Sequence, residues 1–399
     1  MTTREENESL TRVGRNTPMG EFWRRYWIPI GISAELKDKP TFVRVLGEDL
    51  VLFRDGKGKA GLLGALCSHR RANLCLGTVT PEGLRCRYHG WLFDTEGTVL
   101  QTPGEPPDST FKDSIHHPAY PVEELGSLIF AYLGPQPAPP LPRYDFLAAE
   151  GERHAKITGV ANCNWLQCVE NGIDPLHVSF AHSDVWTDLE GEPDTDFEET
   201  DYGFVHKAYR PTDKPGTYNY REHHLLMPGI SCGGSQQRNL EGAAGTPPVS
   251  CRWSVPIDDT HTLIIRLVFK PADNPGRFTK DPIAVAWKSL DIEPYKEYKQ
   301  HSGEGPVTLG YTMSRVIAAQ DATIIGSLGP IVDRENENSS PETDYGILAL
   351  RSMYLKEVEK VRRGEDPKGT VKDKEKNRLI VIPAYEYSIS EEQYRQRKA

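Results

Sequence analysis

The chain has 399 residues and a formal net charge of −10. This length leaves room for two domains of roughly 100 to 200 residues each, and it excludes a small protein that depends on disulfides for its fold. The acidic balance argues against nucleic acid as a partner, because phosphate binding needs a concentrated basic surface and the sequence contains none.

The N-terminal segment is charged and has no apolar signal region, and no later stretch approaches the ~18 apolar residues that span a bilayer. We therefore expect a cytoplasmic protein that does not insert into a membrane. The seven cysteines are odd in number and spread through the chain, which favours reduced thiols or metal ligands over a disulfide framework.

The first third of the chain is predicted to be mostly β-structure. Short apolar runs between residues 42 and 66 are broken by turn residues at 47–49 and 55–58, which is the pattern of hairpins. An apolar strand is expected at residues 128–133, and the proline-rich segment 134–142 after it suits an exposed connector. We therefore place a domain boundary there, with a first domain over residues 1–142 and a second over residues 143–399.

Cysteine and histidine are paired twice within the first domain, as Cys67-x-His69 and as Cys86-x-x-His89. Two thiolates and two imidazoles make a complete ligand set for a metal site. A structural zinc site is the alternative, but zinc loops usually pair cysteine with cysteine or histidine with histidine, whereas here each loop offers one of each.

These loops resemble the Rieske motif, which binds a 2Fe-2S cluster through two cysteines and two histidines, and the sequence from Tyr88 to Trp91 is similar to the version in aromatic-ring-hydroxylating oxygenases. The respiratory-complex type of Rieske domain has one further, disulfide-forming cysteine on each loop. The corresponding places here hold Ala72 and Tyr88. The resemblance therefore implies an antiparallel β Rieske domain of the oxygenase type, in a reducing compartment.

The second domain is predicted to be α+β, with a sheet covered by helices on one side. A helix is expected near residues 162–169, and strands near 202–209, 217–227 and 262–269. A further helix is expected to end at Gly329-Pro330. The last helix is expected to begin with Ser340 as its N-cap and to end at residues 362–364.

A second possible metal site begins with Asp174, His177 and His182, in the pattern D-x-x-H-x4-H. The first two would share a helix face, and a local break before His182 would let the second imidazole converge on the same ion. Because two histidines are more often structural than metal-binding, the prediction needs a third ligand. Two imidazoles and one carboxylate on one side of an iron leave positions open for O2 and substrate.

Asp321 is the predicted third ligand. It falls on the apolar stripe formed by Ile317, Ile324 and Leu328, where a carboxylate is costly to bury unless a cation neutralises it. An ion pair with an arginine is the alternative explanation, and Asp333 and Glu335 are the rival ligands.

This region is similar to the catalytic domain of Rieske oxygenases, in which Asn-x-x-Asp-x-x-His-x4-His recurs. The matching residues are Asn171, Asp174, His177 and His182, and Gln320-Asp321 matches as well. The resemblance implies a helix-grip (START-like) fold, a curved antiparallel sheet closed by helices. Outlying similarities at residues 11–14 and 24–27 look like the phthalate dioxygenase branch, which also includes aromatic O-demethylases.

The resemblance implies the oxygenase component of a multicomponent enzyme, which uses O2 to dihydroxylate, monohydroxylate or O-demethylate an aromatic acid. Electrons would come from NADH through a separate flavin and ferredoxin-type reductase, since the chain has no Gly-rich dinucleotide fingerprint. The alternative from a different class is a non-catalytic Rieske electron-transfer protein, which would not need His177, His182 and Asp321.

Two further residues are assigned roles. In the family that this motif resembles, the aspartate matching Asp174 bridges to a Rieske histidine of a neighbouring subunit, which implies a homotrimer; alternatively, Asp174 only caps the turn before Pro175. Arg221, on a predicted strand, could face a substrate carboxylate. It could equally pair with Glu222 or with an exposed neighbour.

Overall fold

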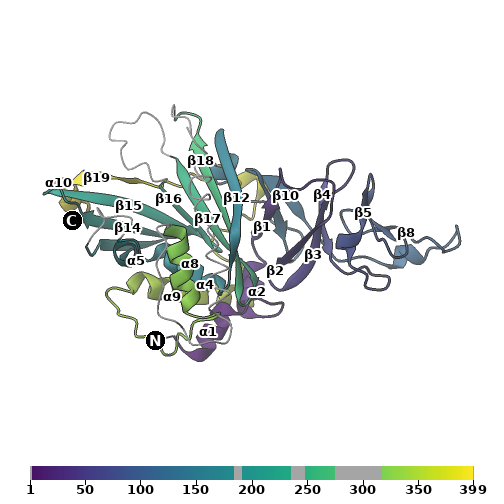
Figure 1. The fold of residues 1–399 in the computed structure, drawn as a ribbon, viewed down its shortest axis with the longest axis horizontal. Coiled ribbons are helices and arrows are strands. Elements are labelled where there is room, and N and C mark those ends of the chain that lie inside the picture. Colours follow the sequence, from purple (N-terminus) through teal and green to yellow (C-terminus); the bar gives the residue numbers. More distant parts are fainter. Residues whose placement is uncertain (1, 184–190, 235–247, 275–316, 399) are drawn as a thin grey trace.

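The structure is a computed structural model that describes residues 2–183, 191–234, 248–274 and 317–398. The molecule is elongated, with one large sheet and its helices at one end and several small sheets at the other (Figure 1).

Three small antiparallel sheets precede the proline-rich segment, in the strand orders β2-β3-β4-β9, β5-β6-β7-β8 and β1-β11-β10. The hairpins predicted for residues 42–66 are confirmed, and the first has a two-residue turn in which Leu46 and Gly47 have φ angles of 51° and 75°. The strands are β1 (Trp27–Ile32), β2 (Thr41–Val45), β3 (Glu48–Arg54), β4 (Ala60–Gly64), β5 (Thr78–Thr80), β6 (Gly83–Arg85), β7 (Leu92–Phe93), β8 (Val99–Gln101), β9 (Ala119–Tyr120), β10 (Val122–Leu125) and β11 (Leu128–Tyr132), and short 3-10 helices occur at Leu74–Leu76 and Phe111–Ser114.

A large antiparallel sheet follows, in the order β12-β18-β17-β16-β15-β14-β13, with β19 paired to β15. The strands predicted near residues 202–209, 217–227 and 262–269 are confirmed as β14, β15 and β18. The strands are β12 (Gly151–Ala161), β13 (Asp194–Thr200), β14 (Gly203–Pro211), β15 (Thr217–Leu226), β16 (Ile230–Gly234), β17 (Val249–Asp258), β18 (His261–Pro271) and β19 (Glu386–Ser390).

Helices α4, α8 and α9 lie on one side of this sheet, which confirms the α+β prediction. Helix α4 contacts β16, β17 and β18 and also packs against α8 and α9 (Figure 1). None of the described helices is long and apolar enough to cross a membrane. The helices are α1 (Arg4–Thr11), α2 (Pro18–Trp23), α3 (Asp145–Ala148), α4 (Trp165–Ile173), α5 (Leu176–Ala181), α8 (Ile317–Ser327), α9 (Tyr345–Arg362) and α10 (Glu391–Lys398), with a 3-10 helix at Lys374–Lys376.

Two predicted helix boundaries are wrong, and in α4 the reason is that a different side chain provides the cap. Helix α4 begins at Trp165 and not near residue 162, since the Asn164 side chain accepts a hydrogen bond from the Leu166 amide. Helix α9 begins at Tyr345. Ser340 instead accepts hydrogen bonds from the amides of Glu342 and Thr343, in a separate turn that precedes the helix.

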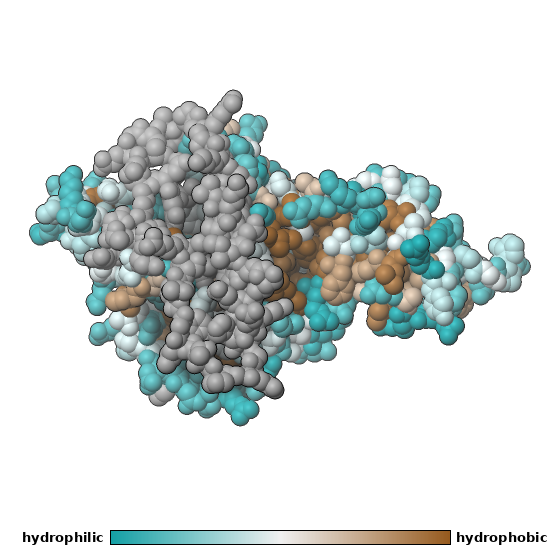
Figure 2. All heavy atoms as spheres, viewed as in Figure 1, coloured by the Kyte–Doolittle hydropathy of each residue, from teal (hydrophilic) through white to brown (hydrophobic). Residues whose placement is uncertain are grey.

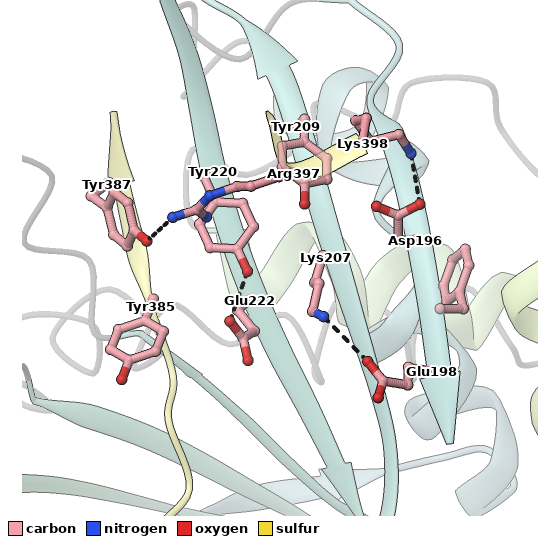
Figure 3. A pocket seen from close by; sticks show the side chains of 11 residues that line it. Asp196, Glu198, Lys207, Tyr209, Tyr220, Glu222, Tyr385, Tyr387, Arg397 and Lys398 are labelled. Atoms are coloured by element: carbon pink, nitrogen blue, oxygen red, sulfur yellow. Dashed lines mark hydrogen bonds and ion pairs between the residues drawn. The ribbon is translucent and has the colours of Figure 1, made fainter. Parts of the chain in front are cut away.

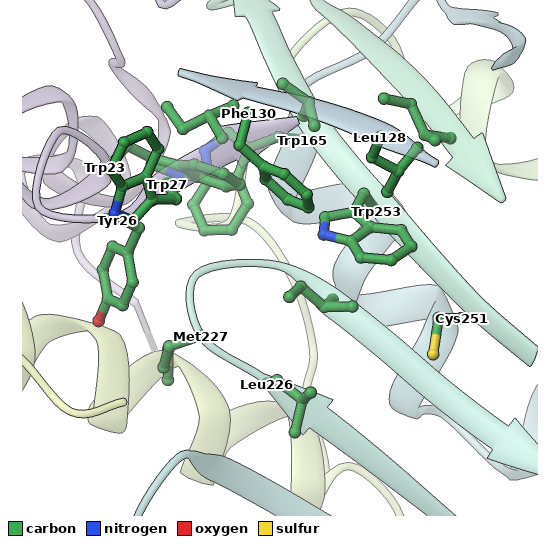
Figure 4. Close-up of a cluster of buried hydrophobic side chains, with 14 of the residues drawn as sticks. Trp23, Tyr26, Trp27, Leu128, Phe130, Trp165, Leu226, Met227, Cys251 and Trp253 are labelled. Atoms are coloured by element: carbon green, nitrogen blue, oxygen red, sulfur yellow. The ribbon is translucent and has the colours of Figure 1, made fainter. Parts of the chain in front are cut away.

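A continuous apolar core joins β1, β11 and the sheet of β2 to β4 to the large sheet, whereas Leu84, Phe93 and Val99 of β6 to β8 belong to a separate cluster. Phe130 of β11 and Trp253 of β17 lie in the same cluster (Figure 4), and hydrophobic residues also gather on the surface where the two ends of the molecule meet (Figure 2). Within this core the rings of Trp23 and Trp165 are 5.2 Å apart at 84°. An extended apolar interface of this kind holds the two ends in a fixed relation.

The N-terminal helices pack with the later part of the chain although they precede β1. The Asn164 side chain donates to the Thr11 carbonyl at 2.8 Å, and the Tyr26 hydroxyl donates to the Lys368 carbonyl at 2.7 Å. Phe22 packs edge-on against Tyr354 of α9. The domain boundary at residue 142 stays a prediction. The contacts show in addition that residues 4–26 pack against the chain that follows this boundary.

Candidate metal centres

The two Cys/His pairs lie on adjacent loops that follow β4 and β6. Cys67 and Cys86 are buried, and the rings of His69 and His89 are 4.5 Å apart nearer the surface. Burial is the main cause that raises the pKa of the Cys67 thiol to about 11, and the neighbouring Cys86 adds to it. Coordination to a metal would remove this proton.

Both loops turn in the same way. The amide of Arg71 donates to the Cys67 carbonyl and the amide of Gly90 donates to the Cys86 carbonyl, at 2.9 and 3.0 Å. Arg71 and Gly90 have φ angles of 61° and 75°, so each loop reverses through a residue in the left-handed region. The next residue, Trp91, stacks on His69 with an interplanar angle of 2°.

These four side chains fit a group with two metal atoms better than a single ion. A single ion holds its ligands within about 2.3 Å of one point. Among the described residues, only His177, His182 and Asp321 place three ligand atoms within 4.8 Å of one another. The Cys/His loops are not so close together, and a cluster whose two irons each take two ligands needs that wider spacing.

His117, which sequence reasoning missed, supports the first loop. It is fully buried, its Nε2–H donates to the Gly64 carbonyl at 2.9 Å, and its Nδ1 therefore accepts from the Ser68 hydroxyl at 2.7 Å. Burial lowers the pKa of His117, which keeps the ring neutral. Nothing in the spacing of Ser68 and His117 signals this contact, because 49 positions separate them.

The segment with the second pattern contains a helix break, but the predicted position of the break is wrong. Helix α4 ends at Ile173 and α5 begins at Leu176, so the break lies before His177 and not between His177 and His182. Pro175 cannot continue the hydrogen bonding of α4. Asp174 accepts hydrogen bonds from the amides of Leu176 and His177 at 2.8 and 3.3 Å, which fixes the start of α5.

The predicted histidines and Asp321 converge. The Asp321 Oδ1 atom lies 3.5 Å from His177 Nε2 and 3.2 Å from His182 Nε2. Burial opposes ionisation of Asp321, but hydrogen bonds to the two histidines outweigh it and hold the pKa of this carboxyl well below its usual range. Asn171 also donates to Asp321, at 3.3 Å. The ionised Asp321 carboxylate and the two imidazoles therefore lie together, as the ligands of one metal ion would.

Hydrogen bonds fix the orientation of both rings. His177 Nδ1–H donates to the Asp174 carbonyl at 2.5 Å, and His182 Nδ1 is 2.7 Å from the buried Gln320 side-chain oxygen. These contacts fix each Nδ1 away from the site and turn each Nε2 toward Asp321, where both Nε2 atoms can serve as metal ligands. Gln320 was noticed in the sequence only through the family resemblance.

The reason given for choosing Asp321 is partly wrong. Ile324 and Leu328 of the predicted apolar stripe are 38% and 54% exposed, whereas Ile325 next to them is buried. The rival carboxylates Asp333 and Glu335 are exposed and do not belong to the group of three.

Comparison with known proteins identifies the family of the chain. Residues 26–121 match a family described as Rieske [2Fe-2S] domain. The chain is 35% identical to the 5,5'-dehydrodivanillate O-demethylase oxygenase subunit of Sphingobium sp., over 96% of this chain and 87% of that protein. It is also 35% identical to the phenoxybenzoate dioxygenase subunit alpha of Ectopseudomonas oleovorans, over 90% and 86%. The protein is an oxygenase subunit of the Rieske non-haem iron oxygenase family.

Relatives of this Rieske oxygenase include phthalate-type dioxygenases as well as O-demethylases. Its fold is similar to the oxygenase in a solved complex titled as the reduced complex between oxygenase and ferredoxin in carbazole 1,9a-dioxygenase. The TM-score is 0.58 at 20% identity, over 86% of this chain and 90% of that one. A Rieske oxygenase carries a 2Fe-2S cluster and a mononuclear iron, and the two groups of side chains above have the ligand types that these take.

Arg221 of this Rieske oxygenase lies on the sheet face that carries the candidate iron site. It is opposite Ala208 in β14, and two residues further along that strand Arg210 donates to the Pro175 carbonyl at the break between α4 and α5. Side chains two residues apart share a face of a sheet. The Nε atom of Arg221 is buried and has no hydrogen-bond partner among the described residues.

The alternative pairing of Arg221 with Glu222 is not formed. Glu222 points to the other face, where it accepts a hydrogen bond from Tyr220 at 2.7 Å and lies 3.1 Å from His224. In β19, Glu386 is directly opposite Arg221.

A groove of about 670 Å³ lies on that other face, between β13 to β15, β19 and α10 (Figure 3). Charged groups of the groove pair with one another: Lys207 is 3.2 Å from Glu198, and Lys398 is 2.6 Å from Asp196. Because the sheet separates the groove from His177, His182 and Asp321, it is not part of the candidate iron site.

Proposed function

We propose that this Rieske oxygenase oxidises an aromatic acid, with the mononuclear iron held by His177, His182 and Asp321 and the cluster held by Cys67, His69, Cys86 and His89. The observation that carries the proposal is the convergence of the three iron ligands within 4.8 Å. When bound, the cluster supplies single electrons and the iron supplies O2 activation. The test is O2 consumption and product mass with a panel of aromatic acids and a surrogate reductase.

The protein side chains prepare the iron site before any metal binds. The Asp174 carbonyl and the Gln320 side chain hold the two Nε2 atoms toward Asp321, and Asn171 restrains the carboxylate. Three ligands on one side leave the remaining positions open for O2 and substrate. A non-catalytic electron carrier would have no use for this second set of ligands.

Metal analysis tests the two centres together. We expect about three irons and two acid-labile sulfides per chain, with the visible absorption of a cluster that has both cysteine and histidine ligands. Stoichiometric zinc without acid-labile sulfide would contradict the assignment of the Cys/His loops.

The electron donor in this proposal is a separate protein, an NADH-dependent reductase of the flavin and ferredoxin type. The absence of a dinucleotide fingerprint in the sequence supports it, as does the ferredoxin in the carbazole dioxygenase complex. We place the reaction in the cytoplasm, where thiols remain reduced.

The proposed active unit is a homotrimer in which Asp174 of one chain lies beside His69 or His89 of the next. The strands around the Cys/His loops, β5 to β8, lie at the opposite end of the long axis from α5 and α8 (Figure 1). Electrons would have to cross this length within one chain, whereas a neighbouring chain can bring its cluster close to Asp174.

Arg221 is the proposed contact for a substrate carboxylate. The Arg221→Met variant should raise the KM for carboxylated aromatics about 10- to 100-fold, since a charge-assisted hydrogen bond contributes roughly 1.5 to 3 kcal/mol. The cluster spectrum should not change. Lys207→Met, on the other face of the same sheet, is the control, and an unchanged KM in Arg221→Met would remove this residue from the pocket.

A further inference from the structure

Two close pairs of cysteine thiols lie in the second part of the chain. In the helix pair, at the start of α4, the sulfur atoms of Cys163 and Cys168 are 3.7 Å apart. In the strand pair, on β16 and β17, those of Cys232 and Cys251 are 2.8 Å apart. All four are free thiols and are at most 3% exposed. Neither pair belongs to a candidate metal centre, and the surroundings of the two pairs differ.

The helix pair lies about one helical turn from the candidate iron site. Helices α4 and α8 contact each other at two levels: Asn171 donates to Asp321 at 3.3 Å, and Cys168 lies in one apolar cluster with Ile325. Cys168 is three residues before Asn171 on α4, and Ile325 is four residues after Asp321 on α8. Residues at these spacings share a helix face. The two levels are therefore roughly 5 Å apart along the helices.

The two thiols of the helix pair are not equivalent. Arg252 donates to the Cys168 carbonyl at 2.7 Å, which brings its positive charge to this cysteine. The hydrogen bond between the two sulfur atoms lowers the pKa of Cys168 and raises that of Cys163. For Cys168 this outweighs the effect of burial, and the charge of Arg252 lowers its pKa further. Because the thiolate is the reactive form, Cys168 is the nucleophile of the pair.

The helix pair can close into a disulfide. The S–S bond of a disulfide is about 2.05 Å long, so the sulfur atoms have to move together by less than 2 Å from their separation of 3.7 Å. Rotation of two short side chains supplies such a movement. Cys163 precedes the helix cap at Asn164 and is outside the hydrogen bonding of α4, so this change does not require the helix to open.

Burial protects these thiols from reagents in solution, but it does not protect them from an oxidant that forms inside the protein. A site that activates O2 releases hydrogen peroxide whenever two electrons reduce O2 and no substrate is oxidised. Peroxide that forms beside Asp321 is within a helical turn of Cys168, and a thiolate is the group that peroxide oxidises most readily.

We propose that Cys168 and Cys163 form a dithiol site that reduces hydrogen peroxide released beside the candidate iron. The Cys168 thiolate attacks one peroxide oxygen, so that an S–O bond forms, the O–O bond breaks, and the departing hydroxide takes up the thiol proton as water. The Cys163 thiol then attacks the Cys168 sulfenic acid, an S–S bond forms, and a second water leaves. In sum, two thiols and one hydrogen peroxide give one disulfide and two waters.

This activity goes beyond the proposed function and depends on it only for the source of the peroxide. Each chain reduces one hydrogen peroxide and is then restored by thiol–disulfide exchange with a thiol reductant. The dithiol would protect the imidazole ligands of the iron site, which lie at the next level of the same helix contact.

The strand pair is an internal control. Cys232 and Cys251 are directly opposite each other in register. Cys251 is next to Arg252, which faces α4, so Cys251 points to the other side of the sheet, into the apolar core (Figure 4). Burial raises the pKa of Cys251 well above its usual value. If closeness of the sulfur atoms alone decided oxidation, the strand pair would oxidise first.

The test follows each cysteine during turnover of the intact metal-loaded protein. The protein, with its thiols reduced beforehand, receives NADH, a surrogate reductase, O2 and benzoate, with catalase in solution to destroy peroxide that leaves the protein. Free thiols are then alkylated under denaturing conditions, and peptide mass spectrometry identifies each disulfide. Matched samples without catalase report the peroxide released, and samples without O2 are the blank. Iron, sulfide and the visible spectrum are measured for every variant.

In the wild-type protein the disulfide of the helix pair should form at least about tenfold faster than that of the strand pair, because a thiol gains tenfold in thiolate for each unit by which its pKa falls toward the working pH. Catalase should not prevent it. Cys163→Ser should stop at the Cys168 sulfenic acid, which dimedone traps. Cys168→Ser or Cys168→Ala should release more peroxide, whereas Cys251→Ser should behave as the wild type.

Three results would overturn the proposal: equal oxidation of the two pairs, a helix-pair disulfide that catalase prevents, or no dimedone adduct in Cys163→Ser. A protein that oxidises substrate and releases peroxide while Cys163 and Cys168 stay reduced is an oxygenase without this dithiol. A protein that consumes no O2, despite full iron content and a reducible cluster, contradicts the proposed function itself. Hydrogen peroxide added directly to that protein then tests the dithiol by the same peptide analysis.

Discussion

The Asp321→Ala variant is expected to lose the mononuclear iron and all product formation while it keeps the 2Fe-2S cluster. The carboxylate supplies the negative charge of the site and lies within 3.5 Å of both histidine Nε2 atoms; two neutral imidazoles alone bind iron weakly. Iron should fall from about three to about two per chain, with acid-labile sulfide and visible absorption unchanged.

Asp333→Ala is the matched control, because Asp333 is an exposed carboxylate in the loop that follows the same helix. It should keep full iron and full turnover. Full iron content in Asp321→Ala, together with loss in Asp333→Ala or Glu335→Ala, would move the third ligand to one of those residues.

The Asp174→Asn variant is expected to keep both metal groups and a reducible cluster but to lose coupled turnover. The asparagine oxygen can still accept hydrogen bonds from the amides of Leu176 and His177, so the start of α5 and the position of His177 should be retained. Only the charge that would link His177 to a neighbouring cluster is removed. A single-turnover assay on the pre-reduced variant, with oligomer size measured alongside, provides the readout.

Asp174→Ala separates the two roles of this residue. It removes both the charge and the cap, which adds about 1 kcal/mol of local destabilisation, whereas Asp174→Asn removes the charge alone. If product yield is normal in Asp174→Asn and falls only in Asp174→Ala, or if a monomer is fully active, Asp174 acts as a cap and the inter-subunit route is wrong.

Local sequence patterns predicted the parts of both centres that lie on one short segment. The two Cys/His pairs and the His177 and His182 pair could be recognised because the members of each pair lie two to five residues apart, and such a spacing is a property of the chain itself. Strands β14, β15 and β18 were also found, because apolar alternation over about ten residues is a strong local signal.

Contacts between distant segments could not be predicted in the same way. His117 reaches Ser68, and Arg252 meets Arg266, only because of strand pairing and loop packing. Asp321 does lie beside the histidines, as predicted. The reason for choosing it was wrong, because most of the apolar stripe on its helix is exposed. The helix starts were missed by a few residues because asparagine and serine can accept amide hydrogen bonds either at a helix start or in a turn. Asn164 does so at the start of α4, whereas Ser340 does so in the turn before α9.

The packing of α1 and α2 against α4 and α9 bears on how the protein folds as it is synthesised. Phe22 and Trp23 emerge from the ribosome early, yet one of the aromatic rings against which Phe22 packs belongs to Tyr354, near the end of the chain. At about 5 to 20 residues per second, the delay between them is roughly 15 to 65 seconds. During that time the small sheets with the Cys/His loops can already form, while the first helices keep apolar side chains exposed. Nascent chains stalled before residue 345 should therefore bind chaperones through their N-terminal residues.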